Sequence, residues 1–112
     1  MLTIETTRYS AVVAAFVERY PSAVPLLDKR HVTAPIDKWC TNANLKSAID
    51  FSLQQESVEL LGFHDGPRNM WASADALPLV EELASRSVLR FSVARVRQPS
   101  FLERLFRRHT DA

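Results

Sequence analysis

The apolar residues near the N-terminus recur at the spacing of an amphipathic helix. Between residues 10 and 20 they lie three or four positions apart and form one stripe, Val12, Val13, Phe16, Val17 and Tyr20. The Ser10 side chain can accept hydrogen bonds from the first helical amide groups, and Pro21 disfavours helical geometry in the residue before it. The pattern predicts a helix over residues 10–20 that Ser10 caps.

Weaker helical signals follow this first helix. Ser22 precedes Pro25, and because a helix tolerates proline in its first turn, a short second helix is expected to begin at Ser22. Pro35 repeats this pattern before a helical turn over residues 36–40. A further helix is predicted over residues 44–54, with an apolar stripe of Leu45, Ala48, Ile49 and Leu53.

The second half of the chain changes to the two-residue period of β-strands. The expected elements are a strand over residues 58–64, a turn at Asp65-Gly66-Pro67, a strand over residues 69–73, a helix over residues 76–85 and a strand over residues 88–96. Asp75 is expected to cap the helix. Along the last strand, Leu89, Phe91 and Val93 are expected to point to one side.

The last predicted element is an amphipathic helix that begins near Ser100. Ser100 and Glu103 have the spacing of a capping box, in which each side chain satisfies an otherwise unpaired amide. One face carries two phenylalanines and two leucines, and the other carries Arg104, Arg107 and Arg108. A helix of about nine residues is not stable alone in water, so it must dock on its own domain, on a partner or on an anionic membrane surface. Docking on its own domain is the favoured interpretation.

These elements predict a single domain of the α+β class that spans residues 1–112. N-terminal helices are expected to pack on a small three-stranded sheet of β-β-α-β order. The C-terminal basic amphipathic helix, within residues 99–112, follows the sheet and could serve as a separate docking element.

The composition excludes several classes of protein. The chain has only two glycines, too few for a phosphate-binding loop or a dinucleotide fingerprint. Cys40 is the only cysteine and is expected to be a small core residue. A single cysteine cannot form an intrachain disulfide, and the sequence has neither a membrane-length apolar run nor a signal-peptide pattern. These features predict a cytoplasmic protein. The three histidines are not spaced as metal ligands, so we expect neither a metal nor a cofactor.

The charge is unevenly distributed along the chain. Residues 86–112 carry seven arginines against two carboxylates, whereas residues 1–85 carry seven Lys and Arg against eleven carboxylates. Such asymmetry can mark an interaction tail, but a strand and a helix whose solvent-exposed faces are rich in arginine are the favoured explanation. Arginine favours bidentate contacts to carboxylates, so an acidic protein surface is one expected partner. Nucleic acid and membranes are less favoured partners, because no aromatic platform or lipid anchor accompanies the arginines.

Residues 64–69 form the segment richest in chemically active side chains. His64 could move a proton while Arg68 offsets developing negative charge, as cleavage or transfer of a phosphoryl group requires. Asp65 and Asn69 complete this loop, but these residue types also suit an ordinary hairpin turn, which is the favoured interpretation. On the following strand Trp71 alternates with Met70, so one of the two faces away from the packed side. If that residue is Trp71, it is a natural interface anchor.

The favoured function is a small non-enzymatic protein-binding module that acts by occupying a protein partner, as an adaptor, an inhibitor or an immunity-type protein does. One alternative is a small nuclease or phosphotransfer enzyme centred on His64 and Arg68. Another is binding of the basic C-terminal helix to nucleic acid or an anionic membrane. No catalytic residue is assigned, and the candidate binding residues are Trp71, His64, Asp65, Arg68, Asn69, Arg104, Arg107 and Arg108.

Overall fold

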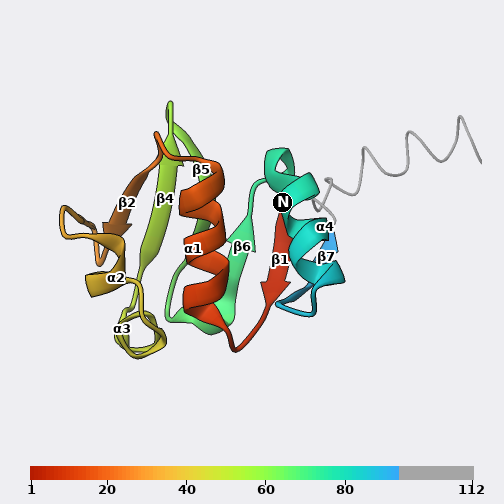
Figure 1. The fold of residues 1–112 in the computed structure, drawn as a ribbon, viewed down its shortest axis with the longest axis horizontal. Coiled ribbons are helices and arrows are strands. Elements are labelled where there is room, and N and C mark those ends of the chain that lie inside the picture. The colour runs from red at the N-terminus through yellow and green to blue at the C-terminus, as the bar shows by residue number, and fades with distance from the viewer. Residues whose placement is uncertain (94–112) are drawn as a thin grey trace, which may run out of the picture.

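Seven β-strands form one antiparallel sheet in the computed structural model, which describes residues 1–93. Neighbouring strands follow the order β3-β2-β4-β5-β6-β1-β7, so the N-terminal strand lies between two strands from the second half of the chain (Figure 1). The strands are β1 (Leu2–Glu5), β2 (Val24–Leu27), β3 (Arg30–His31), β4 (Phe51–Gln55), β5 (Val58–Phe63), β6 (Met70–Ala72) and β7 (Arg90–Val93).

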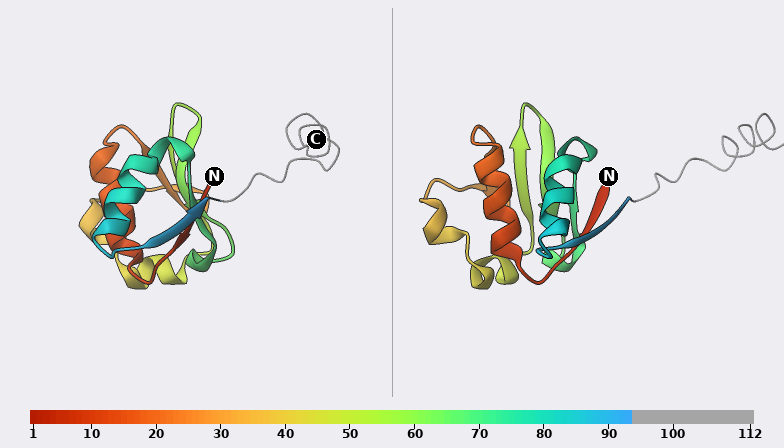
Figure 2. Two further views of the ribbon diagram at one scale, coloured as in Figure 1. Left: turned by 90° about the vertical axis from the view of Figure 1, so that its right-hand side faces the viewer. Right: turned by 45° about the vertical axis from the view of Figure 1, so that its right-hand side comes forward.

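The α-helices of the described residues leave one face of this sheet uncovered. They are α1 (Tyr9–Arg19), α2 (Ile36–Trp39), α3 (Asn42–Ser47) and α4 (Leu77–Ser85). Helices α1 and α4 contact each other and lie on the same side of the sheet in both views of Figure 2. The opposite side carries no α-helix formed by residues 1–93. Two short 3-10 turns, η1 (Pro67–Asn69) and η2 (Ala74–Ala76), flank β6.

The hydrophobic core lies between the sheet and its helices. Val12, Val13 and Phe16 of α1 are fully buried, as the helical stripe predicts. On the sheet side, Phe51 stacks between two other aromatic rings, with centroid distances of 6.1 Å to Trp39 and 5.8 Å to Phe63. Such aromatic pairs contribute about 0.5–1.5 kcal/mol each beyond the burial of their surface.

The predicted fold is wrong, because the sheet has seven strands and not three in β-β-α-β order. Strand β1 was not expected, although Leu2 and Ile4 are buried and the residues between and after them are exposed, which is the two-residue period of a strand. The short helix expected from Ser22 is replaced by β2, and β3 follows it. Strands β4, β2 and β3 extend the sheet beyond β5, and β1 lies between β6 and β7.

The helix predicted over residues 44–54 is also wrong. Helix α3 ends at Ser47, and Ala48 has the extended backbone geometry of a strand (ψ 147°). Beyond it, Phe51 and Leu53 of β4 are buried while their neighbours are less so, as expected for a strand with one covered face. The helical stripe failed at Ile49, whose side chain is 62% exposed.

Several other elements are confirmed with shifted ends. Helices α1, α2 and α4 and strands β5 and β6 occupy the predicted segments, and β7 forms the start of the strand predicted over residues 88–96. The predicted C-terminal helix within residues 99–112 lies outside the described residues.

Two predicted caps are wrong. The N-terminus of α1 is closed by Asn42, whose side chain accepts a hydrogen bond from the Ser10 amide (2.8 Å) and donates one to the carbonyl of Thr7 (3.2 Å). Asp75 lies one residue before the end of η2, and its amide donates to the Ser73 hydroxyl (3.2 Å). A side chain distant in sequence therefore performs the capping expected of Ser10, whereas Ser73 caps η2 and, within residues 1–93, no side chain caps α4.

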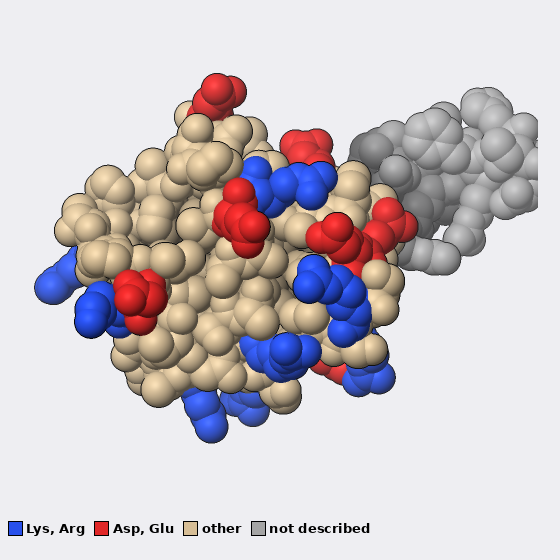
Figure 3. Space-filling view, in the orientation of Figure 1, with Lys and Arg blue, Asp and Glu red and all other residues tan. Residues whose placement is uncertain are grey.

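On the helix-covered side of the molecule, residues 1–93 form no large area of one charge. In Figure 3, Lys and Arg side chains lie interspersed with Asp and Glu over this side, and uncharged surface separates them. This side of the described residues therefore offers no matching surface to a strongly charged partner.

Candidate functional site

The side of the sheet away from the helices carries a row of paired residues, one from each of six neighbouring strands. Residues paired in an antiparallel sheet point to the same face. Pairing across the sheet joins Leu26, Ser52, Gly62, Trp71, Thr3 and Ser92 in this order. We call this row and the side chains beside it the open face.

Trp71 is the largest side chain of the open face. Its neighbours in β6, Met70 and Ala72, are buried against the helices (1% and 0% exposed), so the indole ring of Trp71 points to the other side of the strand. Trp71 itself is half-buried, between Gly62 and Thr3 of the adjacent strands. Trp71, and not Met70, therefore faces away from the packed side of the strand, as an interface anchor at this position requires.

A β-bulge brings Glu59 onto the same face. The register between β4 and β5 shifts at Leu53/Gln54, and the consecutive residues Leu60 and Leu61 of β5 are both buried. Glu59, paired with Gln54, bends over Gly62 so that its carboxylate fills the space that a Cβ atom of residue 62 would occupy. Glycine at this position therefore creates the room for the carboxylate.

One carboxylate oxygen of Glu59 is buried without a partner. Its Oε1 atom has almost no solvent-accessible surface and makes no hydrogen bond within the described part of the chain. Most buried polar atoms in proteins are hydrogen-bonded, because an unpaired one loses its interactions with water without compensation. This oxygen is therefore the atom of the open face that most clearly lacks a donor.

Glu59 lines a pocket of about 180 Å³, here called the Glu59 pocket. Its other lining residues are Leu26, Lys29, Asp50, Phe51, Ser52, Gln54 and His64. The Ser52 hydroxyl accepts a hydrogen bond from the Gln54 amide (3.0 Å). Small-molecule sites usually enclose about 300–1,000 Å³, so this pocket suits one side chain or a small group better than a metabolite.

His64 lines the Glu59 pocket and pairs with a residue that sequence reasoning did not select. Its Nδ1 atom lies 3.0 Å from Oδ1 of Asp50, the residue before β4. The His64 side chain is 65% exposed and that of Asp50 24% exposed, so water reaches the imidazole. A carboxylate at Nδ1 favours the tautomer with a proton there and leaves Nε2 free to accept one.

The rest of the predicted loop forms a turn. The Asn69 side-chain amide donates to the backbone carbonyls of His64 (3.1 Å) and Asp65 (3.5 Å). Asp65 and Gly66 both have left-handed backbone geometry, with φ of 58° and 97°. Arg68 is exposed, does not line the Glu59 pocket and forms no ion pair with another described residue. The structure thus joins His64 to Asp50 and not to Arg68.

Cys40 is half-buried and packs against the core, as expected for a small core residue. Its Sγ donates a weak hydrogen bond to the carbonyl of Ser10 (3.5 Å), and burial raises the pKa of the thiol to about 11. At neutral pH the thiol is protonated, which makes it a poor nucleophile.

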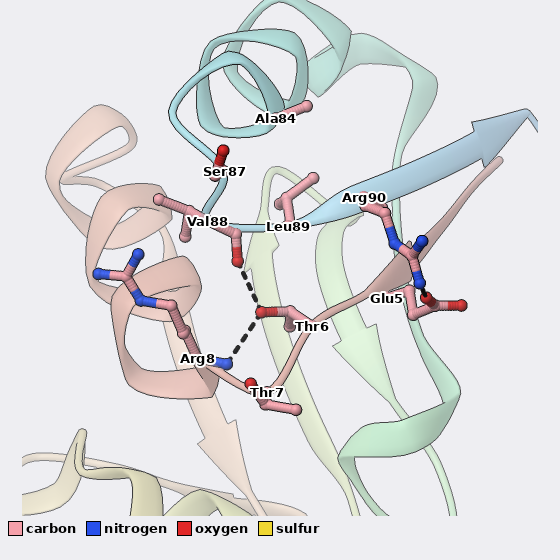
Figure 4. A pocket seen from close by; sticks show the side chains of 9 residues that line it. All are labelled: Glu5, Thr6, Thr7, Arg8, Ala84, Ser87, Val88, Leu89 and Arg90. Atoms are coloured by element: carbon pink, nitrogen blue, oxygen red, sulfur yellow. Dashed lines mark hydrogen bonds and ion pairs between the residues drawn. The ribbon is translucent and has the colours of Figure 1, made fainter.

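A larger pocket of about 460 Å³ lies where β1, β7, α1 and α4 meet (Figure 4). Three of its side chains, those of Thr6, Arg90 and Glu5, already form hydrogen bonds or an ion pair within the fold. The Thr6 hydroxyl donates to the carbonyl of Val88 (2.7 Å) and accepts from the amide of Arg8 (2.9 Å). Arg90 pairs with Glu5, and Figure 4 shows the side chains of Arg8 and Arg90 pointing away from each other. The two guanidinium groups therefore do not converge on one ligand.

Two further observations limit the kinds of site. Within residues 1–93, no three side chains of His, Cys, Asp or Glu are grouped to hold a metal ion. None of the helices in that range has the length and apolar character needed to cross a membrane. The candidate residues Arg104, Arg107 and Arg108 lie outside the described residues.

Comparison with known proteins returned no relative. No protein family, curated protein sequence or solved structure matches the chain.

Proposed function

We propose that the protein is a small non-enzymatic binding module that occupies a protein partner with the open face of its sheet. The observation that carries this proposal is the position of Trp71, a half-buried tryptophan on a sheet face without a covering helix from residues 1–93. Tryptophan is strongly enriched among the few residues that dominate binding energy at protein interfaces. An adaptor, an inhibitor and an immunity-type protein all act in this way.

The surroundings of Trp71 support the same proposal. Interfaces combine an aromatic centre with a polar, hydrated rim. Thr3, Ser52 and Ser92 lie in the same row as Trp71 and supply hydroxyl groups on both sides of it. We place the protein in the cytoplasm, because its one cysteine forms no intrachain disulfide.

The basic C-terminal segment adds a second part to the proposal. Its arginines Arg104, Arg107 and Arg108 would contact carboxylates on an acidic partner surface. Replacing all three by glutamate should abolish partner capture while the protein keeps its fold. Unchanged capture would remove this segment from the proposed interface.

The proposal is tested by capture from native lysate with the full chain and two variants. Trp71→Ala removes the proposed anchor, and Ile49→Ala removes an exposed apolar side chain that lies outside the row of the open face. An anchor at an interface centre contributes at least about 2 kcal/mol, so Trp71→Ala should weaken binding about thirtyfold or more. Ile49→Ala should bind as the wild type does, and equal binding by all three chains would refute the proposal.

A second candidate function is acid–base catalysis, favoured by the 3.0 Å contact between His64 and Asp50. A carboxylate that orients a histidine is a common part of hydrolytic sites, and the predicted nuclease or phosphotransfer activity needs such a base. If a panel of phosphodiester and phosphoryl substrates reveals an activity, His64→Ala and Asp50→Asn should abolish it. The matched variant His31→Ala should retain it, and activity that survives His64→Ala would end this candidate.

A further inference from the structure

The Glu59 pocket is lined by a residue whose buried carboxylate oxygen forms no hydrogen bond within the described part of the chain. Oε1 of Glu59 is buried and unpaired within residues 1–93, and Asp50 contributes a second carboxylate. Gln54 and Ser52, whose side chains are hydrogen-bonded to each other, also line the pocket. An acceptor-rich pocket around a buried carboxylate oxygen calls for a ligand group that carries several donors and a positive charge.

We propose that the Glu59 pocket receives one arginine side chain of the partner protein, a step that rests on the proposed function. Arginine offers five N–H donors in a planar fork, and this geometry suits two carboxylates and a neighbouring hydroxyl or amide oxygen. Leu26 lines the same pocket and provides apolar surface for the methylene groups of the arginine stem. The pocket volume of about 180 Å³ suits a single side chain.

The charge of the pocket supports a cationic occupant. Asp50 and Glu59 bring two carboxylates, against one lysine, Lys29, and the histidine His64, which pairs with Asp50. Lys29 is exposed, so water and salt screen its charge, whereas Oε1 of Glu59 has almost no solvent-accessible surface. The field that an entering guanidinium meets is therefore dominated by the buried carboxylate.

Gly62 connects this pocket to Trp71. Glu59 lies over Gly62, and Gly62 pairs directly with Trp71 in the next strand. An arginine in the pocket and an apolar group against Trp71 would thus contact neighbouring positions of one surface. A partner segment that carries an arginine next to an aromatic or aliphatic residue fits this pair of positions.

The test uses the full, ¹⁵N-labelled protein and a small probe, Nα-acetyl-arginine methylamide. Titration should move the backbone amide signals of Ser52, Glu59 and Gly62 in a saturable manner. The matched citrulline compound has nearly the same shape without the charge and should bind at least tenfold more weakly, because hydrogen bonds to charged groups are worth about tenfold or more in affinity. The lysine compound should also bind more weakly, and equal or tighter binding of either compound would overturn the proposal.

Two variants test whether the amide shifts on titration with the arginine compound depend on the carboxylate of Glu59. Glu59→Gln keeps the size of the side chain and should weaken arginine binding at least about tenfold. Glu81→Gln removes an exposed carboxylate on α4 and should leave the titration unchanged. Both variants must unfold in urea at about the wild-type midpoint. Arginine binding that persists in Glu59→Gln, or no saturable shift at these amides in the wild type, would overturn the proposal.

The failure of this inference is distinguishable from the failure of the proposed function. If Trp71→Ala loses the partner while Glu59→Gln keeps it, the open face binds a protein but the arginine site is wrong. If the probe binds through Glu59 but Trp71→Ala keeps its partner, the arginine site stands and the proposed function is wrong.

Discussion

The carboxylate of Glu59 lies over Gly62, in the space that a methyl group on residue 62 would fill. The same methyl group would come within 3.0 Å of the carbonyl oxygen of Phe51, which belongs to the backbone of the neighbouring strand. A side chain can rotate away, but a paired strand cannot move without disturbing its hydrogen bonds. The close approach of β4, β5 and the Glu59 side chain therefore depends on glycine at this position.

Gly62→Ala should destabilise the fold by about 1–3 kcal/mol, the usual cost of overfilling a packed site. Removing the obstructing side chain in Gly62→Ala/Glu59→Ala should restore part of this loss, since the two residues share one space. Urea unfolding of the wild type, both single variants and the double variant measures this coupling. Strictly additive changes in the free energy of unfolding would show that the two residues do not compete.

The side chain that stabilises the start of α1 is expected to be Asn42. Asn42→Ala removes the hydrogen bonds to the Ser10 amide and the Thr7 carbonyl and should cost about 0.5–2 kcal/mol, the range for helix caps. Ser10→Ala is the matched control, because the hydroxyl of Ser10 makes no hydrogen bond within residues 1–93. Thermal unfolding of the two variants should separate them, and a larger loss for Ser10→Ala would contradict this assignment.

Phe51 is expected to be one of the most sensitive core positions. Its ring lies between Trp39 and Phe63, so Phe51→Ala should cost about 3–5 kcal/mol and leave the protein largely unfolded or close to it. Ile49→Ala, two residues earlier and 62% exposed, should change the free energy of unfolding by less than about 0.5 kcal/mol. Urea titrations followed by circular dichroism provide the comparison, and similar losses at both positions would argue against the described core.

Cys40 should react slowly in the folded protein. Its pKa of about 11, against an ordinary value of 9.0, lowers the thiolate fraction at neutral pH about a hundredfold. Alkylation by iodoacetamide at pH 8 should therefore be slow in buffer and rapid in urea. Alkylation in buffer at the rate seen in urea would contradict this environment for the thiol.

The raised pKa of Cys40 also predicts a pH dependence of stability. Because the folded protein holds the thiol proton more tightly than the unfolded chain, the thiol's contribution is fully present below about pH 9. It is lost as the pH rises through about 11. Cys40→Ala has no thiol to titrate, so its stability lacks this pH dependence. The free energy of unfolding of the wild type, minus that of the variant, should therefore decrease over that range. A constant difference would contradict the prediction.

The order of the second half was predictable from local patterns, whereas the extent of the sheet was not. Segments that become β5, β6 and α4 have one clear period each and strong turn residues between them. The segment around Ile49 and Leu53 carries apolar residues at both helical and strand spacing, so only pairing with β2 and β5 decides its conformation. Strand β1 could have been predicted from the alternation of apolar and polar residues at Leu2 and Ile4.

In the candidate site, too, some features follow from local sequence patterns and others depend on strand pairing. The alternation of Met70 and Trp71 restricted Trp71 to one of two faces, and burial of Met70 selects the outward one. The contact of Asp50 with His64 needs the pairing of β4 with β5, which brings residues 14 positions apart into contact. The position of Glu59 depends on a β-bulge, which no local pattern in the sequence predicts.

The central claim is that the open face binds the partner. The most direct test is to add the captured partner to the ¹⁵N-labelled full chain and to map its binding site from the changes in NMR signals. The largest signal changes should occur at the indole N–H of Trp71 and at the amides of Thr3, Ser52 and Gly62. These positions lie in one row across the sheet. Changes confined to α1 and α4, with the Trp71 indole signal unmoved, would contradict the account.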